Sequence, residues 1–214
     1  MRAGILILLL ILTSLCLLTH AQRPTYHFDR LTTQNGLSDN WVHEAMMDRH
    51  GFVWFGTQDG LCRYDGQSFK KYRRSLNDSL SLSGNIVTDL VEDANGRIWL
   101  STLDGGLNHF DPITEKFHSY LYDPERASGL SANTTLRLHL DANQIIWIGT
   151  YNAGLNRFDP ATGRFRQYHF METETDLHQA FLKNSVLDII PDYTDQNILW
   201  LGSNQGVYRF DKTA

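Results

Sequence analysis

Four short apolar segments, each centred on a tryptophan, recur along the chain between polar turns. Their tryptophans lie 45, 48 and 53 residues apart, at Trp54, Trp99, Trp147 and Trp200. A strand covered on both faces has a continuous apolar sequence rather than an alternating one. Segments such as residues 145–148 therefore predict buried middle strands, and the repeat predicts several copies of one structural unit.

Each copy is predicted to contain four short strands. The first strand opens after an asparagine and ends at an aspartate, the second carries the tryptophan, and the third ends in an aromatic residue followed by aspartate. The asparagines are Asn40, Asn85, Asn133 and Asn184, and the aspartates that end the first strand are Asp48, Asp93, Asp141 and Asp192. Four strands in a repeat of this length are typical of a propeller blade. The predicted fold is an all-β propeller made of four-stranded antiparallel blades.

The expected blade repeats cover about 32–75, 76–123, 124–170 and 180–214. The last repeat ends inside its third turn, before a fourth strand, whereas residues 26–31 resemble a lone fourth strand ahead of the first blade. Two interpretations follow. Residues 26–31 close a four-bladed ring with Phe210, or the four blades belong to a larger ring. The end in mid-turn favours the larger ring and an N-terminal fragment. Residues 171–181 form a longer insert with room for a short helix from Asp176; a plain surface loop is favoured over a part of the binding face.

The first 21 residues have the pattern of a secretory signal peptide. Arg2 supplies a positive charge, residues 5–18 are almost entirely apolar, and Ala21 provides a small residue at a cleavage site. About 20 residues are needed to span a bilayer, so cleavage is favoured over anchoring. The mature domain is then expected at 22–214, exported to the periplasm. It retains one cysteine, Cys62, which predicts a domain without an internal disulfide.

The repeated motifs resemble the two-component regulator propeller repeat over nearly all of the mature chain. The resemblance rests on Leu-Ser pairs ahead of the asparagines, on Trp-Phe-Gly-Thr, Trp-Leu-Ser-Thr and Trp-Ile-Gly-Thr, and on the Gly-Leu segments that end in an aromatic residue and aspartate. The family implies the periplasmic sensor of a hybrid two-component receptor. Its parent protein is anchored in the inner membrane by later segments, carries a cytoplasmic histidine kinase and is capable of dimerising. The family also implies an oligosaccharide or related small-molecule ligand.

The same repeat position places a charged residue four residues after each asparagine. These residues, Glu44, Asp89, Arg137 and Asp188, stand in otherwise largely apolar first strands. First strands line the centre of a propeller, so the four are candidate ligand-binding residues, since charged groups give strong directional hydrogen bonds to hydroxyl-rich ligands. The alternative is that they face channel water without a specific role. The four tryptophans are expected to be structural core residues.

Motifs for catalysis, cofactors or metals are not found in the sequence. It lacks a Gly-x-Ser-x-Gly elbow, a His-Glu-x-x-His motif, a phosphate loop and paired cysteines, and its histidines are scattered. We therefore expect no enzyme activity, no cofactor and no metal site in this chain. The net charge of −5 argues against nucleic acid, and the basic run 70–74 falls on an expected edge strand.

Two other functions fit a propeller as well as ligand sensing does, because the fold alone does not determine function. One is a secreted enzyme, a lyase or glycan hydrolase, which requires clustered histidines or carboxylates. The other is an exported scaffold that binds another protein through a broad apolar face. The family resemblance places ligand sensing first.

Overall fold

The computed structural model describes residues 26–170 and 184–213, and the expected signal segment and the insert at 171–181 lie outside these residues. The chain divides into two compact units, residues 1–30 and 31–214. In the first unit the described residues, 26–30, form no regular secondary structure, and His27 Nε2 lies 3.4 Å from Asp29 Oδ1. The expected lone strand at 26–31 is therefore not formed in this structure, and its role in closing a ring stays a prediction.

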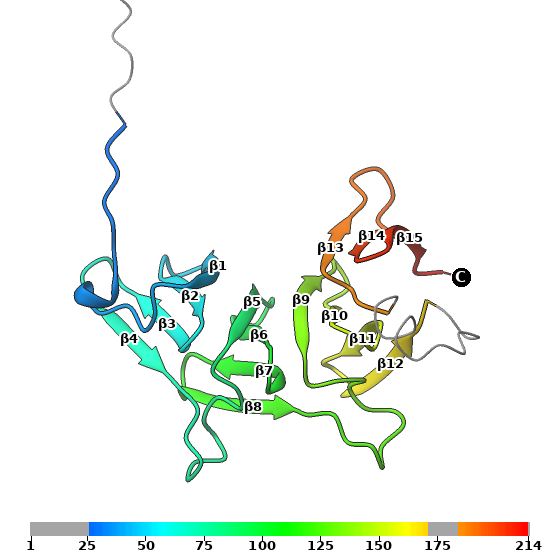
Figure 1. The fold of residues 1–214 in the computed structure, drawn as a ribbon, viewed down its shortest axis with the longest axis horizontal. Coiled ribbons are helices and arrows are strands. Elements are labelled where there is room, and N and C mark those ends of the chain that lie inside the picture. The colour runs from blue at the N-terminus through cyan, green and yellow to red at the C-terminus, as the bar shows by residue number, and fades with distance from the viewer. Residues whose placement is uncertain (1–25, 171–183, 214) are drawn as a thin grey trace, which may run out of the picture. The chain divides into compact units, whose positions relative to one another are not determined.

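The second unit consists of antiparallel β-sheets that follow one another along the chain (Figure 1). A short 3-10 helix, η1 (Thr33–Asn35), precedes the sheets; Thr32 caps it. The described residues form three four-stranded sheets and one three-stranded sheet, each with its strands in sequence order. This is the predicted all-β architecture of propeller blades, with three strands in the last blade as the sequence indicated.

The strand bounds follow the predicted pattern closely. The first two blades comprise β1 (Val42–Met47), β2 (Val53–Thr57), β3 (Gly60–Tyr64) and β4 (Phe69–Tyr72), then β5 (Val87–Glu92), β6 (Ile98–Thr102), β7 (Gly106–Asp111) and β8 (Lys116–Tyr120). The last two comprise β9 (Thr135–Leu140), β10 (Ile146–Thr150), β11 (Leu155–Asp159) and β12 (Arg164–Tyr168), then β13 (Asp188–Pro191), β14 (Ile198–Ser203) and β15 (Gly206–Asp211). The first strand of each blade adjoins that of the next, so β1, β5, β9 and β13 are consecutive neighbours.

The core lies between blades, where the tryptophan of one blade meets an aromatic ring of the next. The rings of Trp54 and Phe110 meet edge-on with centroids 5.4 Å apart, and Trp99–Phe158 and Trp147–Phe210 repeat this contact at 5.6 and 5.4 Å. Such edge-to-face pairs add to the large apolar area that each ring buries. Each interface thus holds one hydrophobic cluster built from two successive blades.

Trp200 departs from the expectation that all four tryptophans are core residues. Trp54, Trp99 and Trp147 are at most 2% exposed, whereas Trp200 is 38% exposed. The reason is positional: among the described residues, no further blade supplies the aromatic ring that covers the tryptophan in the first three blades. Val207 on the neighbouring strand β15 is 71% exposed for the same reason.

Two glycines in the second strands permit this close packing of blades. A Cβ atom at Gly56 would lie 2.9 Å from the Val87 side chain, and one at Gly149 would lie 2.8 Å from Val186. A side chain at either glycine would displace this valine of the following blade. Glycine is thus a packing requirement in the first and third blades, whereas the second blade has Ser101 there, hydrogen-bonded to Thr88 of the same blade.

Candidate functional site

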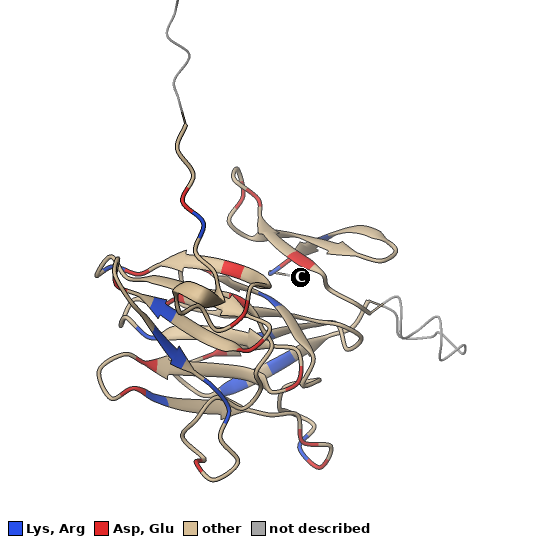
Figure 2. Cartoon of the chain, turned by 60° about the vertical axis from the view of Figure 1, so that its left-hand side comes forward, with Lys and Arg blue, Asp and Glu red and all other residues tan. Residues whose placement is uncertain are grey.

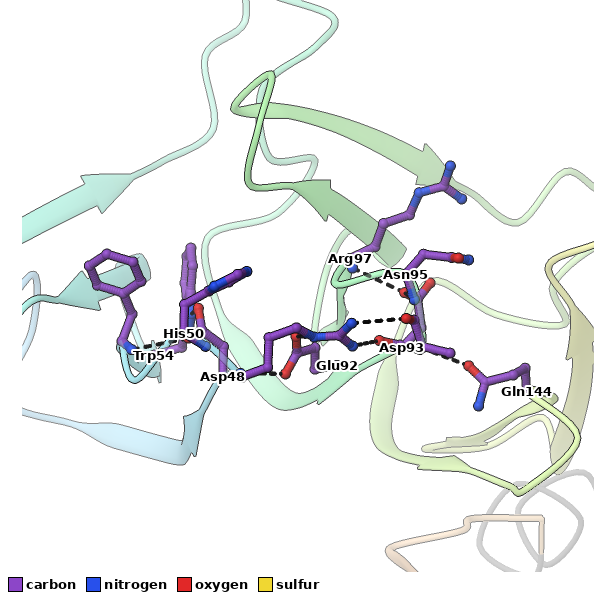
Figure 3. Close-up of polar contacts among 11 residues, drawn as sticks. Asp48, His50, Trp54, Glu92, Asp93, Asn95, Arg97 and Gln144 are labelled. Carbon is purple, nitrogen blue, oxygen red and sulfur yellow. Dashed lines mark hydrogen bonds and ion pairs between the residues drawn. The ribbon is translucent and has the colours of Figure 1, made fainter.

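Each tryptophan is tied to the turn that precedes its strand by an aspartate. The indole Nε1 donates to Oδ2 of the aspartate at 2.8 Å for Trp54 and Asp48 and at 2.9 Å for Trp99 and Asp93. The other carboxylate oxygen of Asp93 accepts the backbone N–H groups of Asn95 and Arg97 (Figure 3). One buried carboxylate therefore satisfies three donors, which identifies these aspartates as turn caps rather than catalytic groups.

The turns of neighbouring blades are also linked to each other. The Arg49 guanidinium contacts the Glu92 carboxylate and the carbonyl oxygens of Asp93 and Ala94. The side chain of Gln144 accepts the Ala94 N–H at 2.8 Å (Figure 3). These contacts join the turn ends of the first three blades and hold their first strands in register.

The four predicted ligand-binding residues occupy the adjoining first strands at one repeat position, and among them Arg137 and Asp188 are in direct contact. Asp89 Oδ2 accepts the backbone N–H of Leu138 in the next blade at 2.7 Å, and Asp89 Oδ1 accepts that of Leu90. Arg137 Nη1 donates to the Thr88 carbonyl at 3.1 Å, and its Nε lies 3.8 Å from Asp188 Oδ1. Arg137 therefore bridges the second and fourth blades.

Burial divides these residues into two groups. Asp89 is 7% exposed, whereas the side chains of Arg137 and Asp188 are 37% and 55% exposed. Burial raises the pKa of Asp89 to about 6, partly offset by the hydrogen bonds from Leu138 and Leu90 and by Arg137, while Glu44 raises it further. Asp89 thus positions the neighbouring strand, and Glu44, Arg137 and Asp188 have greater access to solvent.

One exposed aromatic residue, which directly precedes β1, was not singled out by its position in the repeat. Trp41 is 67% exposed, its ring centroid lies 6.0 Å from that of His43, and His43 Nε2 is hydrogen-bonded to Gln58 Oε1 at 2.9 Å. A large exposed indole is typical of binding surfaces. Its sequence signal was that it is the single tryptophan outside the repeat register.

Basic and acidic residues are interspersed over the strands and turns (Figure 2). The basic run begins on β4, an edge strand of the first blade, as expected. Lys70 Nζ lies 2.5 Å from Glu115 Oε2, and Arg73 Nη2 lies 2.6 Å from Asp59 Oδ2. Two cations of the run, Lys70 and Arg73, are therefore engaged by carboxylates.

Cys62 is a buried free thiol that contacts Ser38. In the described part of the chain, no group of three or more histidine, cysteine, aspartate or glutamate side chains is arranged to hold a metal ion. The same residues include no helix with the length and hydropathy needed to cross a bilayer.

Comparison with known proteins finds similarity to signalling proteins. The family model for the two component regulator propeller matches residues 36–59 and 81–104. A segment of 63 residues is 41% identical to Histidine kinase P4 of Formosa agariphila and covers 29% of this chain but 5% of that protein.

Two solved structures from B. thetaiotaomicron cover most of the chain. The extracellular domain of an inferred hybrid two component system, BT3049, is 27% identical with a TM-score of 0.76 over 88% of this chain. That of an inferred one component system, BT4673, is 25% identical with a TM-score of 0.63 over 85%. The chain spans 26% and 22% of their lengths. The resemblance inferred from the sequence is thus confirmed: two segments of the chain match the two-component regulator propeller model, and its fold is like part of the extracellular domains of such systems.

Proposed function

We propose that this chain is an extracytoplasmic ligand-binding sensor module of a two-component signalling receptor. In this proposal it is exported to the periplasm, and the receptor of which it forms part is anchored in the inner membrane. Support comes from the matched repeats and from the similarity to extracellular domains of signalling systems. The ligand that we propose is an oligosaccharide or a related hydroxyl-rich small molecule.

The observation that carries the proposal is the set of charged side chains at one repeat position on β1, β5, β9 and β13, in which Arg137 and Asp188 are in contact. Glu44, Arg137 and Asp188 offer carboxylate acceptors and guanidinium donors on adjoining strands, with Arg137 already oriented by the Thr88 carbonyl. Hydroxyl groups of a sugar both donate and accept, so they match such a mixed set. The exposed indole of Trp41, just before β1, adds a flat apolar surface of the kind that supports binding.

The ligand class is tested by screening the chain against an immobilised panel of bacterial, plant and host oligosaccharides and measuring the best binder by calorimetry. The site is tested with Glu44→Gln, Arg137→Gln and Asp188→Asn. Each should weaken binding by roughly tenfold, the effect of losing about 1.4 kcal/mol from a charged hydrogen bond. Glu125→Gln, in an exposed loop, is the matched control.

The outcomes separate the ligand class from the site. If the panel yields no binder, the proposed ligand class is wrong. If an oligosaccharide binds and all three variants retain wild-type affinity while thermal unfolding shows them folded, the module binds sugar elsewhere and the charged set is not the site.

A further inference from the structure

Successive blades are separated by clefts at the end where the turns between their first and second strands lie. Different side chains fill these clefts. The residue after the turn-capping aspartate is Arg49, Ala94 or Ala142 in the first three blades. Arg49 crosses into the second blade and contacts its Glu92. Between the second and third blades the Gln144 side chain reaches Ala94, and a cleft of about 170 Å³ remains.

The corresponding cleft between the third and fourth blades is much larger, at about 520 Å³. Ala142 lines it and ends at Cβ, so no side chain takes the place that Arg49 fills in the first interface. Small-molecule sites in proteins are commonly about 300–1,000 Å³ in volume. This cleft is therefore of the size of a ligand site, and it lies apart from the charged set on the first strands.

The carboxylates that line this cleft already have partners. Asp141 accepts the N–H groups of Asn143 and Ile145 and the Trp147 indole, and Lys212 Nζ lies 3.6 Å from its Oδ2. Lys212 stands where the second and third blades have Pro112 and Pro160, and its side chain is 14% exposed. The second lining carboxylate, Asp192, likewise accepts donors from Thr194, Asp195 and Trp200.

Arg157 is the cation of this cleft whose donors are unused. It lies on β11 opposite Trp147, and among the described residues its guanidinium forms no hydrogen bond and no ion pair within 4 Å. Its counterpart in the first blade, Arg63, lies 4.0 Å from Glu115. His139 also lines the cleft, and burial lowers the pKa of its imidazole, so the ring is neutral at pH 7 and able to donate and accept.

We infer that the cleft between the third and fourth blades binds a small hydroxylated carboxylate. Arg157 receives the carboxylate through its paired N–H donors, the geometry in which guanidinium groups bind such anions best. His139 and the amide of Asn197, both in the lining, are the partners for hydroxyl groups. Lys212 neutralises Asp141, so that this buried carboxylate does not repel the ligand.

The test measures binding to the full chain by ligand-detected NMR titration. D-glucuronate is the probe, and D-glucose is its neutral counterpart. The chain should bind glucuronate at least roughly tenfold more tightly than glucose, and Arg157→Gln should remove that preference. Arg209→Gln is the matched control, because Arg209 holds the same repeat position opposite Trp200 in the fourth blade but does not line the cleft. Ala142→Arg, which installs the side chain found at Arg49, should block binding.

The comparison of Arg157→Gln with Arg209→Gln decides the inference by itself. Ala142→Arg adds a separate test, because its larger side chain would fill the cleft. If glucuronate binds no better than glucose, or if Arg157→Gln and Arg209→Gln bind it equally, the inference is wrong. Glu125→Gln, in an exposed loop, should leave glucuronate binding unchanged. A loss of glucuronate binding in Glu44→Gln and Asp188→Asn, with Arg157→Gln unaffected, would place the bound carboxylate at the charged set and overturn the cleft site.

Discussion

The indole Nε1 of Trp200 donates to Asp192 Oδ2 at 2.9 Å, the same bond that the three earlier tryptophans make, although Trp200 alone is 38% exposed. The bond belongs to the blade itself, because both residues come from one sheet. The burial of the ring belongs to the interface, because it requires the aromatic residue of the following blade. The fourth blade therefore has the same aspartate–tryptophan hydrogen bond as the first three blades, but it lacks the packing that buries the tryptophan ring in them.

This separation predicts unequal costs for the same substitution. Trp147→Ala removes a ring that is 2% exposed and should lower the free energy of unfolding by roughly 3–5 kcal/mol. Trp200→Ala removes a partly exposed ring without an aromatic partner from a next blade and should cost about half of that or less. Denaturant unfolding of the two variants measures the difference. Equal costs would mean that another surface covers Trp200 in solution.

The aspartate that caps the turn and the tryptophan should be energetically coupled. Asp93→Asn replaces one carboxylate oxygen by an amide N–H₂ group, so either the Trp99 indole or the turn N–H groups lose their acceptor. The variant should lower the free energy of unfolding by roughly 1–3 kcal/mol. Trp99→Phe removes the indole donor, and the double variant should cost less than the sum of the two. Asp65→Asn is the control, since Asp65 caps an exposed turn through Gln67 and Ser68 without an indole. Additive costs for Asp93 and Trp99 would contradict the coupling.

The strand order and bounds could be predicted because each blade repeats its punctuation: an asparagine before the first strand, an aspartate after it and a tryptophan in the second. The charged residues at one repeat position could likewise be grouped from the sequence alone. The burial of Asp89 could not, because it depends on the backbone N–H of Leu138 in another blade. The exposure of Trp200 depends in the same way on a neighbour rather than on its own repeat.

The cleft between the third and fourth blades left a sequence signal that is visible only when the repeats are compared position by position. Ala142 replaces Arg49, and Lys212 replaces the prolines Pro112 and Pro160. Each change is ordinary for a surface turn. Their joint effect appears only when two blades pack together, because one change removes a filling side chain and the other brings a cation to Asp141.

Gln144 occupies a turn position where the first two blades have glycine, and its backbone is left-handed, with φ of 62°. Gly51 and Gly96 have φ of 85° and 81°. Gln144→Ala keeps the strain of this conformation, about 1–2 kcal/mol for a residue with a Cβ, and loses the bond to the Ala94 N–H. Gln144→Gly loses the same bond but relieves the strain. We therefore expect the glycine variant to unfold at higher denaturant than the alanine variant, and the reverse order would contradict the left-handed conformation.

The raised pKa of Asp89 predicts how stability depends on pH. Its carboxyl titrates near pH 6 in the folded chain and near 3.8 when unfolded, so the folded chain holds the extra proton between these values. Stability from this group is therefore present in full below about pH 4, is lost as pH rises to about 6, and stays constant above, with a total loss of about 3 kcal/mol.

Asp89→Asn cannot titrate, so its stability relative to wild type should rise by up to that amount between pH 4 and 7 in denaturant unfolding. Glu125→Gln, in an exposed loop, should run parallel to wild type. Arg137→Gln removes the cation that lowers the pKa of Asp89, so the loss of stability should occur at higher pH in this variant than in wild type. If the Asp89→Asn curve ran parallel to wild type at every pH, the Asp89 carboxyl would not be buried in solution.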